Sequence, residues 1–593
     1  MEQILEKGIR LHQMRIIQGN PLANAGEILR RMARDREEGV RLSIFPEWAL
    51  CGALAPAEWL NPDLARQCDE ALARVIEATA SGPAVILGTS LPWQGSRVSA
   101  VVAAEKGVPV HPEGSPLSFI PKFHSPLDRL DRYVDGPDTL HLACQCKCEP
   151  EALYQPFNFE SFSIAAWSGV CPGRVLTHLT RTAERLVHLT TRPYVRNRRA
   201  SFPALSSLRP VMHCGGIGLV DTGKTLFVLT GGTGWSYPNG KARVAPFMEE
   251  SALDWGDGAG TEAPIPHDTP RDLITVMEFA VQAQLRRLGL KRVIIGASGG
   301  IDSALAAALY SRVLPPEDLL LVNMPGRFNS RTTISLARKL ATAIGCNYTE
   351  IPIEESRNLT VGQIDGKVCE RPGTGLPGAP LSLSPFAVEN VQARDRSSRI
   401  LAALSSAFGG VYTCNANKSE TTVGYGTLYG DISGFFAVLA DLWKLEVWEV
   451  SKAYNRDIFG EEIIPQGSID IVPSAELSEK QNVDEGRGDP LFYPWHDRIF
   501  AAWTERDIPL SPRVMVERYR DGTLAEEIGY PDDDWKRRFP TEEVLAADLQ
   551  RYWKLFQGLA RAKRLQAPPL LSLKNRTYGF DLGLSQLPIP VFS

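Results

Sequence analysis

The segment Ser298–Ser303, with the sequence Ser-Gly-Gly-Ile-Asp-Ser, constrains this chain more than any other segment does. It follows the apolar run Val293–Gly296 and precedes the run Ala304–Leu309, so the expected order is strand, glycine-rich turn and helix. Two adjacent glycines let an anion approach the backbone without a Cβ in the way, and a helix N-terminus carries positive partial charge. The two serines offer hydroxyls to phosphate oxygens, and Asp302 offers a carboxylate to Mg²⁺. The segment therefore predicts a phosphate-binding loop after a buried strand.

The spacing of this loop separates it from the best-known phosphate loop, because it lacks the Gly-Lys-Ser/Thr ending of the Walker pattern. It resembles instead the pyrophosphate loop of the ATP-pyrophosphatases, enzymes that cleave ATP to AMP and pyrophosphate. The alternative is an ordinary glycine-rich turn between a strand and a helix. The match along the whole segment, in the right strand–helix setting, favours the phosphate loop.

Size and charge exclude several classes of protein. With 593 residues the chain is expected to hold two or more domains. A net charge of −5 argues against nucleic-acid binding as the main function. The sequence has no apolar run of about 18 residues, and Met1–Arg15 has no apolar signal core. We therefore expect a cytoplasmic protein with neither nucleic-acid nor membrane partners.

The ten cysteines do not suggest a disulfide framework in a chain of this length. Their only cluster is Cys144–Cys148, which reads Cys-x-Cys-x-Cys. Such a run can bind a soft metal, but it lacks a second ligand pair at the spacing of a zinc site. Incidental thiols in a strand or loop are the favoured interpretation.

The chain divides into two α/β halves. The first alternates apolar runs with turn signals, and Ala23–Glu37 and Leu64–Ala80 show helical periodicity, which predicts an α/β sandwich. In the second, strands and helices alternate as in a doubly wound parallel sheet. We expect a domain over 10–255, a linker over 256–270 that is rich in Gly, Asp and Pro, and a second domain over 271–593. The Gly- and Pro-rich stretch from 357 to 385 is a candidate mobile lid.

Further segments of the second half narrow the family. Together they closely resemble NAD synthetase, in the family's order and with similar spacing. These segments are Glu389–Arg394, Tyr412–Glu420, Val423–Asp431, Asp441–Lys444, Pro473–Leu477 and Ala562–Pro569.

This resemblance implies roles for individual residues. Asp302 and Glu420 should ligate Mg²⁺, and Lys444 should reach a phosphate of ATP, which makes Asp302 and Lys444 the catalytic candidates. Arg394 and Lys563 should contact deamido-NAD. The remaining residues implied to bind ATP are Gly296, Ser298, Gly299, Gly300, Ile301, Ser303, Met324, Asn415 and Ser474.

The chain departs from the family's pattern at several positions. Asn415 and Ala416 stand where the family usually has Thr-Gly, and an asparagine can still donate and accept a hydrogen bond. Leu428 and Ala562 stand where ammonia-dependent members often carry a lysine and a histidine. Those two substrate contacts are therefore not transferred to this chain.

Segments of the first half resemble the nitrilase, or carbon–nitrogen hydrolase, family. They are Ile16–Pro21, Phe45–Gly52, Pro121–His124 and Arg132–Gly136. A nitrilase-like domain ahead of NAD synthetase is the arrangement of the glutamine-dependent enzymes. In those enzymes it hydrolyses glutamine and passes ammonia to the synthetase site.

The nitrilase mechanism needs a Glu as general base, a Lys to stabilise the oxyanion and a Cys as nucleophile. Glu47 and Lys122 fit the first two roles. The strand that should end in the cysteine carries Trp167 or Ser168 at that position. We therefore expect an inactive glutaminase domain, in which Glu47, Lys122, Trp167 and Ser168 are the remnant site. Rescue by Cys171, or chemistry at Ser168, remains as an alternative.

The sequence thus predicts an α/β enzyme that joins a nitrilase-like αββα sandwich to a doubly wound, Rossmann-like NAD synthetase domain. It should convert deamido-NAD to NAD through an acyl-adenylate, with ATP, Mg²⁺ and ammonia as the direct donor. The resemblance also implies a homo-oligomer, at least a dimer. The alternatives are a functional glutamine-dependent enzyme, an ATP-pyrophosphatase that amidates another carboxylate, and a non-catalytic scaffold.

Overall fold

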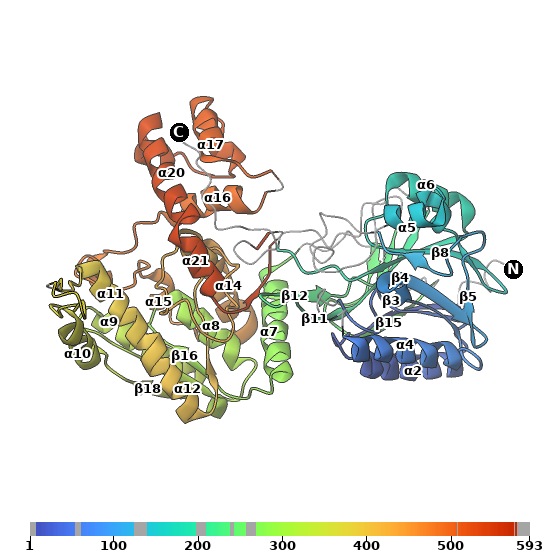
Figure 1. Ribbon diagram of the computed structural model, residues 1–593, viewed down its shortest axis with the longest axis horizontal. Coiled ribbons are helices and arrows are strands. Elements are labelled where there is room, and N and C mark those ends of the chain that lie inside the picture. Colours follow the sequence, from blue (N-terminus) through green and yellow to red (C-terminus); the bar gives the residue numbers. More distant parts are fainter. Residues whose placement is uncertain are drawn as a thin grey trace. The chain divides into compact units, whose positions relative to one another are not determined.

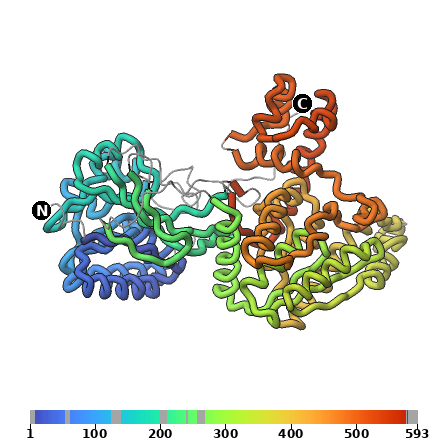
Figure 2. The backbone as a smooth tube through the Cα atoms, turned by 180° about the vertical axis from the view of Figure 1, so that it is seen from behind, coloured from blue at the N-terminus to red at the C-terminus, as the bar shows by residue number. Residues whose placement is uncertain are grey.

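The computed structural model describes residues 8–53, 58, 61–123, 139–196, 209–237, 242–255, 268–376, 378–506, 508–574 and 576–577. The chain divides into two compact units, Met1–Asp272 and Leu273–Ser593 (Figures 1 and 2). Each unit contains its own sheet and its own helices. No helix in the described ranges is both long and apolar enough to cross a membrane.

The first unit is built around two sheets. The first sheet has the strand order β15-β1-β2-β3-β4-β5, with β6 paired to β4. Its longest ladder is antiparallel, between β3 and β4, with Val85 opposite Ala104. The strands are β1 (Ile9–Gln13), β2 (Leu42–Ile44), β3 (Ala84–Trp93), β4 (Ser96–Glu105), β5 (Val108–Val110), β6 (Ile120–Pro121) and β15 (Ser251–Asp254).

The second sheet has the order β14-β13-β10-β9-β8-β7, and its central strands β8, β9 and β10 are parallel. The strands are β7 (Phe157–Asn158), β8 (Ser163–Ser168), β9 (Arg185–Thr190), β10 (Val211–Gly215), β13 (Gly234–Ser236) and β14 (Ala242–Val244). A further antiparallel hairpin joins β11 (Ile217–Asp221) to β12 (Thr225–Thr230).

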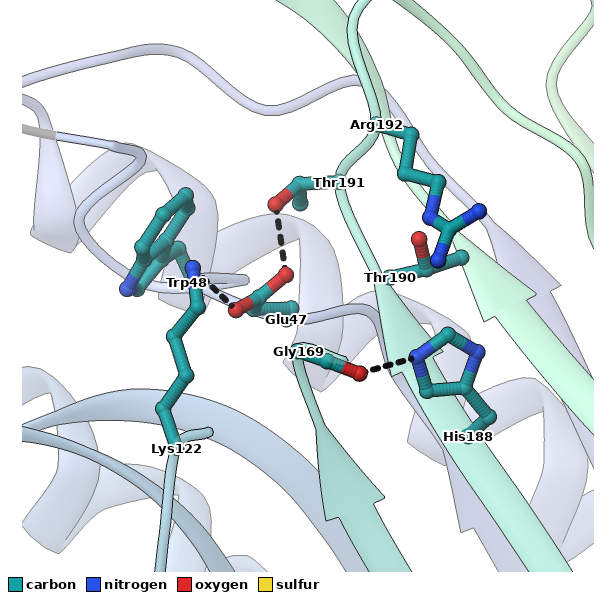
Figure 3. A pocket seen from close by; sticks show the side chains of 8 residues that line it. All are labelled: Glu47, Trp48, Lys122, Gly169, His188, Thr190, Thr191 and Arg192. Carbon is teal, nitrogen blue, oxygen red and sulfur yellow. Dashed lines mark hydrogen bonds and ion pairs between the residues drawn. The ribbon is translucent and has the colours of Figure 1, made fainter. Parts of the chain in front are cut away.

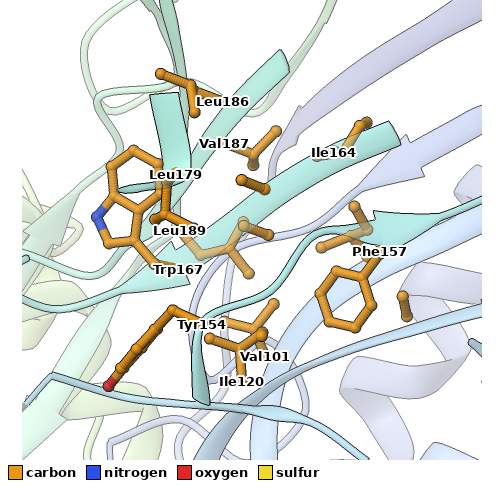
Figure 4. Close-up of a cluster of buried hydrophobic side chains, with 14 of the residues drawn as sticks. Val101, Ile120, Tyr154, Phe157, Ile164, Trp167, Leu179, Leu186, Val187 and Leu189 are labelled. Carbon is orange, nitrogen blue, oxygen red and sulfur yellow. The ribbon is translucent and has the colours of Figure 1, made fainter. Parts of the chain in front are cut away.

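Helices cover the outer faces of both sheets, which makes this unit an αββα sandwich (Figure 1). Helices α2 (Pro21–Glu37) and α4 (Pro62–Ala78) lie on the first sheet, and the side chains of Asn20 and Asn61 cap their N-termini. Helices α5 (Thr139–Cys146) and α6 (Gly173–Thr182) and a 3-10 turn over Pro150–Leu153 lie on the second. The core between the sheets includes Val101, Ile164 and Trp167 (Figure 4).

The second unit contains a four-stranded parallel sheet with the order β18-β17-β16-β19. The strands are β16 (Val293–Gly296), β17 (Leu319–Asn323), β18 (Asn347–Glu350) and β19 (Val411–Tyr412). The chain proceeds from β16 outward to β18 and returns to the other side of β16 with β19. The strand order therefore reverses between β16 and β19, and open α/β sheets bind ligands at the carboxyl ends of strands at such a point.

Helices precede, connect and follow the strands of this sheet along the chain. They are α7 (Pro270–Arg287), α8 (Ile301–Ser311), α9 (Arg331–Ile344), α10 (Glu354–Ile364), α11 (Pro385–Arg394) and α12 (Ala402–Phe408), with a 3-10 turn over Pro316–Asp318 and a π-helical segment over Asp395–Leu401 between α11 and α12. The stretch from 357 to 385 was expected to be loop-like, but its first eight residues belong to α10. Glu354 and Glu355 in the first turn of α10 favour this helix, because acidic side chains stabilise a helix N-terminus.

The rest of this unit is mainly helical. An aromatic core, which includes Trp495, Trp503 and Trp535, holds the later helices together. The elements are α13 (Lys418–Val423), α14 (Lys444–Ala453), a π-helical segment over Tyr454–Phe459, α15 (Gln466–Asp470), a 3-10 turn over Val483–Glu485, α16 (Tyr493–Thr504), α17 (Pro512–Arg520), α18 (Leu524–Glu527), α19 (Trp535–Arg538), α20 (Glu542–Gln557), α21 (Leu559–Gln566) and the short strand β20 (Leu570–Leu571).

Candidate active site

The phosphate-binding loop predicted from the sequence lies between β16 and α8, at the point where the strand order reverses. Gly299 has φ +87°, and a Cβ there would lie only 2.1 Å from the carbonyl oxygen of Thr333. Only glycine therefore fits this position. The hydroxyl of Ser303 donates to the carbonyl of Gly300 over 3.0 Å and accepts from the backbone N–H of Ser298 over 3.2 Å. These bonds brace the loop from within.

A lysine and two carboxylates converge next to this loop. Nζ of Lys444, at the start of α14, lies 2.5 Å from Oδ2 of Asp302 and 3.3 Å from Oε1 of Glu420. Asp302 is in the first turn of α8, and Glu420 is in the first turn of α13. Three helix N-termini that are far apart in the sequence therefore meet at one point. The structure brings together the three residues that the resemblance assigns to phosphate and metal binding.

Burial and charge set the protonation preferences of this group. Burial raises the pKa of Glu420 to about 8, and the neighbouring charges of Asp302 and Asp489 add to that effect. Burial alone would lower the pKa of Lys444, but the charges of Asp302 and Glu420 outweigh it and raise that pKa above its usual value. Lys444 is thus held as an ammonium ion, and its charge in turn favours the ionised form of Glu420 against the effect of burial.

Asn417 links the two carboxylates, and the sequence analysis did not assign it a role. Its amide donates to Oδ1 of Asp302 over 2.8 Å, and its side-chain oxygen accepts from the backbone N–H of Glu420 over 3.0 Å. It therefore caps α13 and orients Asp302 at once. The sequence signal that could have identified Asn417 is its place in Tyr412–Glu420, one of the segments that resemble NAD synthetase.

Two further acidic residues belong to this site and were also not foreseen. Burial raises the pKa of Asp489, which accepts a hydrogen bond from the hydroxyl of Tyr493 over 2.9 Å. Asp497 is buried and accepts from the Ser419 hydroxyl over 2.5 Å and from the backbone N–H of Leu445 over 3.1 Å. Asp497 thereby fixes the start of the helix that carries the lysine.

Two of the residues implied to hold the nucleotide, Asn415 and Met324, lie next to Gly296, at the end of the strand that leads into the loop. The amide of Asn415 donates to the carbonyl of Gly296 over 3.4 Å, so the substituted position still reaches the loop. The methyl group of Met324 also lies near Gly296, since a Cβ there would be 3.3 Å from it. The hydroxyl of Ser474 makes a local hydrogen bond, accepting from the backbone N–H of Glu476 over 3.3 Å.

The two residues implied to contact deamido-NAD both reach one segment, Val423–Asp431. Nε of Arg394 donates to the carbonyl of Leu428 over 3.0 Å. Nζ of Lys563 donates to the carbonyl of Gly424 over 2.6 Å, and burial lowers the pKa of this lysine. The structure therefore gathers these cations at one edge of the site.

The carboxylate pair fits Mg²⁺. Magnesium in nucleotide sites is usually held by one or two carboxylates, with phosphates and waters as the other ligands. Asp302 and Glu420 both face the Lys444 ammonium, and these two carboxylates would hold such a cation. Within the described ranges, no three His, Cys, Asp or Glu residues are grouped closely enough to hold a metal on their own. This also leaves the Cys144–Cys148 run without support as a metal site.

The first unit has a polar pocket of its own (Figure 3). Nζ of Lys122 lies 3.0 Å from Oε1 of Glu47 and 3.8 Å from the centre of the Trp48 ring. The Thr191 hydroxyl donates to Oε2 of Glu47 over 2.7 Å. The remnant pair expected from the sequence is thus assembled and buried. The pocket has a volume of about 10 Å³, which is room for one water molecule and not for a glutamine side chain.

The residue that completes this pocket at the end of β8 is Gly169. This differs from the expectation that Trp167 or Ser168 would occupy the nucleophile position. Trp167 is fully buried in the apolar core (Figure 4), and Ser168 is buried as well. Gly169 has φ +80°, and a Cβ there would lie 2.0 Å from the carbonyl oxygen of Phe123. The position facing Glu47 and Lys122 therefore excludes any side chain.

Cys171 is not among the described residues that line this pocket. It lies two residues beyond Gly169 and packs partly buried against the apolar core. Burial raises the pKa of its thiol to about 12, so little of it is present as the reactive thiolate near neutral pH. Geometry and acidity both argue against it as a relocated nucleophile.

One of the residues that line the pocket, His188, pairs with a second buried histidine, His213 (Figure 3). Nε2 of His188 is 3.2 Å from the carbonyl oxygen of Gly169, so that nitrogen donates. Nδ1 of His188 is 3.3 Å from Nδ1 of His213, whose Nε2 is 2.9 Å from the hydroxyl of Ser236. Burial lowers the pKa of His188 to about 3 and that of His213 well below its usual value. Both rings are therefore neutral, and the chain of hydrogen bonds is satisfied with each ring carrying one proton.

Comparisons with known proteins relate both units of this chain to one family of enzymes. The model of the NAD synthase family matches residues 273–509. Over 96% of its length the chain is 28% identical to the glutamine-dependent NAD(+) synthetase of Synechocystis sp., of which 97% is covered.

Two solved structures share the fold along the chain. One is a glutamine-dependent NAD+ synthetase of Acinetobacter baumannii in complex with ADP, with a TM-score of 0.64, 22% identity and 97% of each chain covered. The other is a glutamine-dependent NAD(+) synthetase of Cytophaga hutchinsonii, with a TM-score of 0.72, 14% identity and coverage of 99% of this chain and 97% of that one. The predicted fold class is confirmed.

Proposed function

We propose that this chain is an NAD synthetase, because its C-terminal unit carries an NAD synthase domain. It amidates deamido-NAD to NAD with ATP and uses ammonia as the direct donor. The observation that carries the proposal is the meeting of Lys444, Asp302 and Glu420 beside the Ser298–Ser303 loop at the switch point of the sheet. This arrangement suits a reaction in which negative charge concentrates on phosphates.

The reaction follows from the substrate's chemistry. Hydroxide is a poor leaving group, so ammonia does not displace it directly from the nicotinate carboxylate. The carboxylate first attacks the α-phosphate of ATP, which forms an acyl-adenylate and releases pyrophosphate. Ammonia then attacks the acyl carbon, the amide forms, and AMP leaves with a proton lost to solvent. Both steps develop charge that nearby cations and dipoles stabilise.

The residues of this chain have separate tasks in that sequence. Backbone N–H groups of the loop and the N-terminus of α8 hold the ATP phosphates. Lys444 places a positive charge on the phosphates during adenylation, and Arg394 and Lys563 hold deamido-NAD. Asp302 and Glu420 would hold Mg²⁺, which supplies further charge neutralisation at the phosphates when it is bound.

Ammonia is the proposed donor because no cysteine or serine is among the described residues that line the nitrilase-like pocket. Gly169 takes the position against Glu47 and Lys122, and the pocket is too small for glutamine. The second candidate is glutamine as donor, and the similarity along the chain to a synthetase named glutamine-dependent favours it. The two donors predict different outcomes in one assay.

The test is NAD formation by the purified protein with ATP, Mg²⁺ and deamido-NAD, with ammonium chloride or glutamine as donor. We expect NAD, AMP and pyrophosphate with ammonium, and neither NAD nor glutamate with glutamine. Glutamate release together with NAD would overturn the ammonia proposal. Pyrophosphate release only with a different carboxylate would overturn the choice of substrate, and no pyrophosphate release with any substrate would favour a scaffold.

A further inference from the structure

Lys444 occupies an unusual position for a phosphate-binding lysine. Its side chain is buried, and its ammonium lies between Asp302 and Glu420, at 2.5 Å and 3.3 Å. The ring of Tyr493 is 5.6 Å away, measured from Nζ to the ring centre. The ammonium therefore fills the point at which the two carboxylates of the metal pair converge.

We propose that Lys444 is an internal counter-ion, which neutralises Asp302 and Glu420 in the nucleotide-free protein and transfers to a phosphate when Mg²⁺ and ATP bind together. The metal pair is then open to a divalent cation only when the nucleotide draws the lysine away. This inference rests on the proposed function, because ATP is the ligand that receives the lysine.

The charges of the site support this exchange. Two carboxylates that are mostly removed from water repel each other, and an uncompensated buried charge is costly. Lys444 removes that cost when no nucleotide is present. An ammonium between two carboxylates also opposes the binding of a second cation at the same point. Free Mg²⁺ would have to displace it and would gain no phosphate ligands in return.

The ligand count leads to the same conclusion. Asp302 and Glu420 supply carboxylate ligands, and the described residues contain no group of three side chains able to hold a metal alone. Magnesium keeps octahedral coordination and is held in nucleotide sites partly by phosphates. The site is therefore complete only with the nucleotide, which also offers the phosphate that attracts the lysine.

The backbone of Lys444 is fixed while its side chain is long. Its backbone N–H donates to the Ser419 hydroxyl over 2.9 Å, and the next N–H, of Leu445, donates to Asp497. The four-carbon stem can then swing about a fixed base. Because Asp302 belongs to both the metal pair and the phosphate loop, the phosphates lie within the reach of such a swing.

The test is a titration of the free protein with Mn²⁺, followed by electron paramagnetic resonance of the unbound ion. Lys444→Met should bind Mn²⁺ at least about tenfold more tightly than the unchanged protein in the absence of nucleotide, because the competing ammonium is gone. Lys574→Met is the matched control. Lys574 is a buried lysine that pairs with Glu446, and Glu446 lies on α14, the helix that carries Lys444. Neither residue belongs to the metal pair, so the loss of Lys574 should leave the Mn²⁺ affinity unchanged.

A second measurement keeps the proposal testable if Lys444→Met does not fold. Mn²⁺ affinity of the unchanged protein is compared with and without a non-hydrolysable ATP analogue, and the analogue should tighten it by at least about tenfold. Equal affinity in Lys444→Met and the unchanged protein, or no effect of the analogue, would overturn the inference. A protein that shows both effects but makes no NAD would overturn the proposed function and leave this inference standing.

Discussion

The carbonyl oxygen of Phe123 closes the position that a nucleophile would need, because a Cβ on Gly169 would lie 2.0 Å from it. Gly169 also has φ +80°, which side chains rarely adopt. The pair Glu47–Lys122 and this glycine line a pocket that has room for one water molecule. At Gly169 the backbone therefore leaves no room for a side chain.

Gly169→Cys should consequently not restore glutamine hydrolysis. The new side chain would meet the Phe123 backbone, so we expect the first unit to lose about 3 kcal/mol of stability or more, and no glutamate release from glutamine. The measurements are urea unfolding and a glutaminase assay. Gly173→Ala is the control, since a Cβ at Gly173 meets nothing within 4 Å and its stability should be unchanged or slightly higher. Glutamine turnover by Gly169→Cys would contradict this account.

The buried ion pair in the same pocket should behave as a unit. Lys122→Met leaves the Glu47 carboxylate buried without this cation, and breaking a buried pair costs about 3–5 kcal/mol. Adding Glu47→Gln removes the stranded charge and should recover a large part of that loss. Urea unfolding of the single and double variants measures the difference. Lys106→Met serves as the control, because the exposed pair of Lys106 with Glu160 should contribute no measurable stability. Additive losses in the double variant would contradict the coupling.

The two buried histidines should make the first unit sensitive to acid. The pKa of His188 is about 3 in the folded chain, whereas an unfolded histidine has a pKa of 6.5. Below pH 6.5 the unfolded chain takes up a proton that the folded chain does not, so stability is present above pH 6.5 and is lost as the pH falls toward 3. The full loss from His188 is about 5 kcal/mol.

Hydrogen exchange of peptides from β8, β9 and β10, measured from pH 4.5 to 7, tests this. The protection of these amides against exchange should fall as the pH is lowered. In His188→Gln the free energy of unfolding should depend less steeply on pH, by about 1.4 kcal/mol per pH unit. His111 gives the control, because it is exposed in the folded chain, and His111→Gln should leave the slope unchanged. An unchanged slope in His188→Gln would show that the ring is not held neutral.

The sequence predicted the helices of the first unit well, because each shows one apolar face. The periodicity of Ala23–Glu37 and Leu64–Ala80 corresponds closely to α2 and α4. It did not predict the register at the end of β8. Five of the six residues of that strand are buried, so there is no alternation of apolar and polar side chains to fix which residue faces the pocket.

The group formed by Lys444, Asp302 and Glu420 illustrates a different limit. Asp302 and Lys444 are 142 residues apart, and only the family resemblance placed them together. Local patterns carry no information on such a contact. Asp489 and Asp497 went unassigned for the same reason, because their roles depend on which helix N-termini they face in the folded chain.

Substitutions at Asn417 can separate an effect on the stability of the chain from an effect on its activity. It caps α13 by accepting from the N–H of Glu420 and donates to Asp302 over 2.8 Å. Asn417→Ser keeps the cap, since serine is about as good an N-cap as asparagine. Its shorter side chain has no amide to donate to Asp302, so Asp302 and its contact with Lys444 are disturbed. We expect NAD formation to fall about 100-fold with little change in the unfolding midpoint.

Asn417→Ala removes both functions and should lose about 1 kcal/mol of stability in addition to activity. Ser511→Ala provides the matched control, because Ser511 caps α17 by accepting from the N–H of Val514 and does not touch the active-site residues. It should lose a similar amount of stability while NAD formation, measured with saturating ammonium and ATP, stays unchanged. If Asn417→Ser instead loses stability and keeps its activity, then Asn417 acts only as a cap, and Asp302 does not depend on its amide.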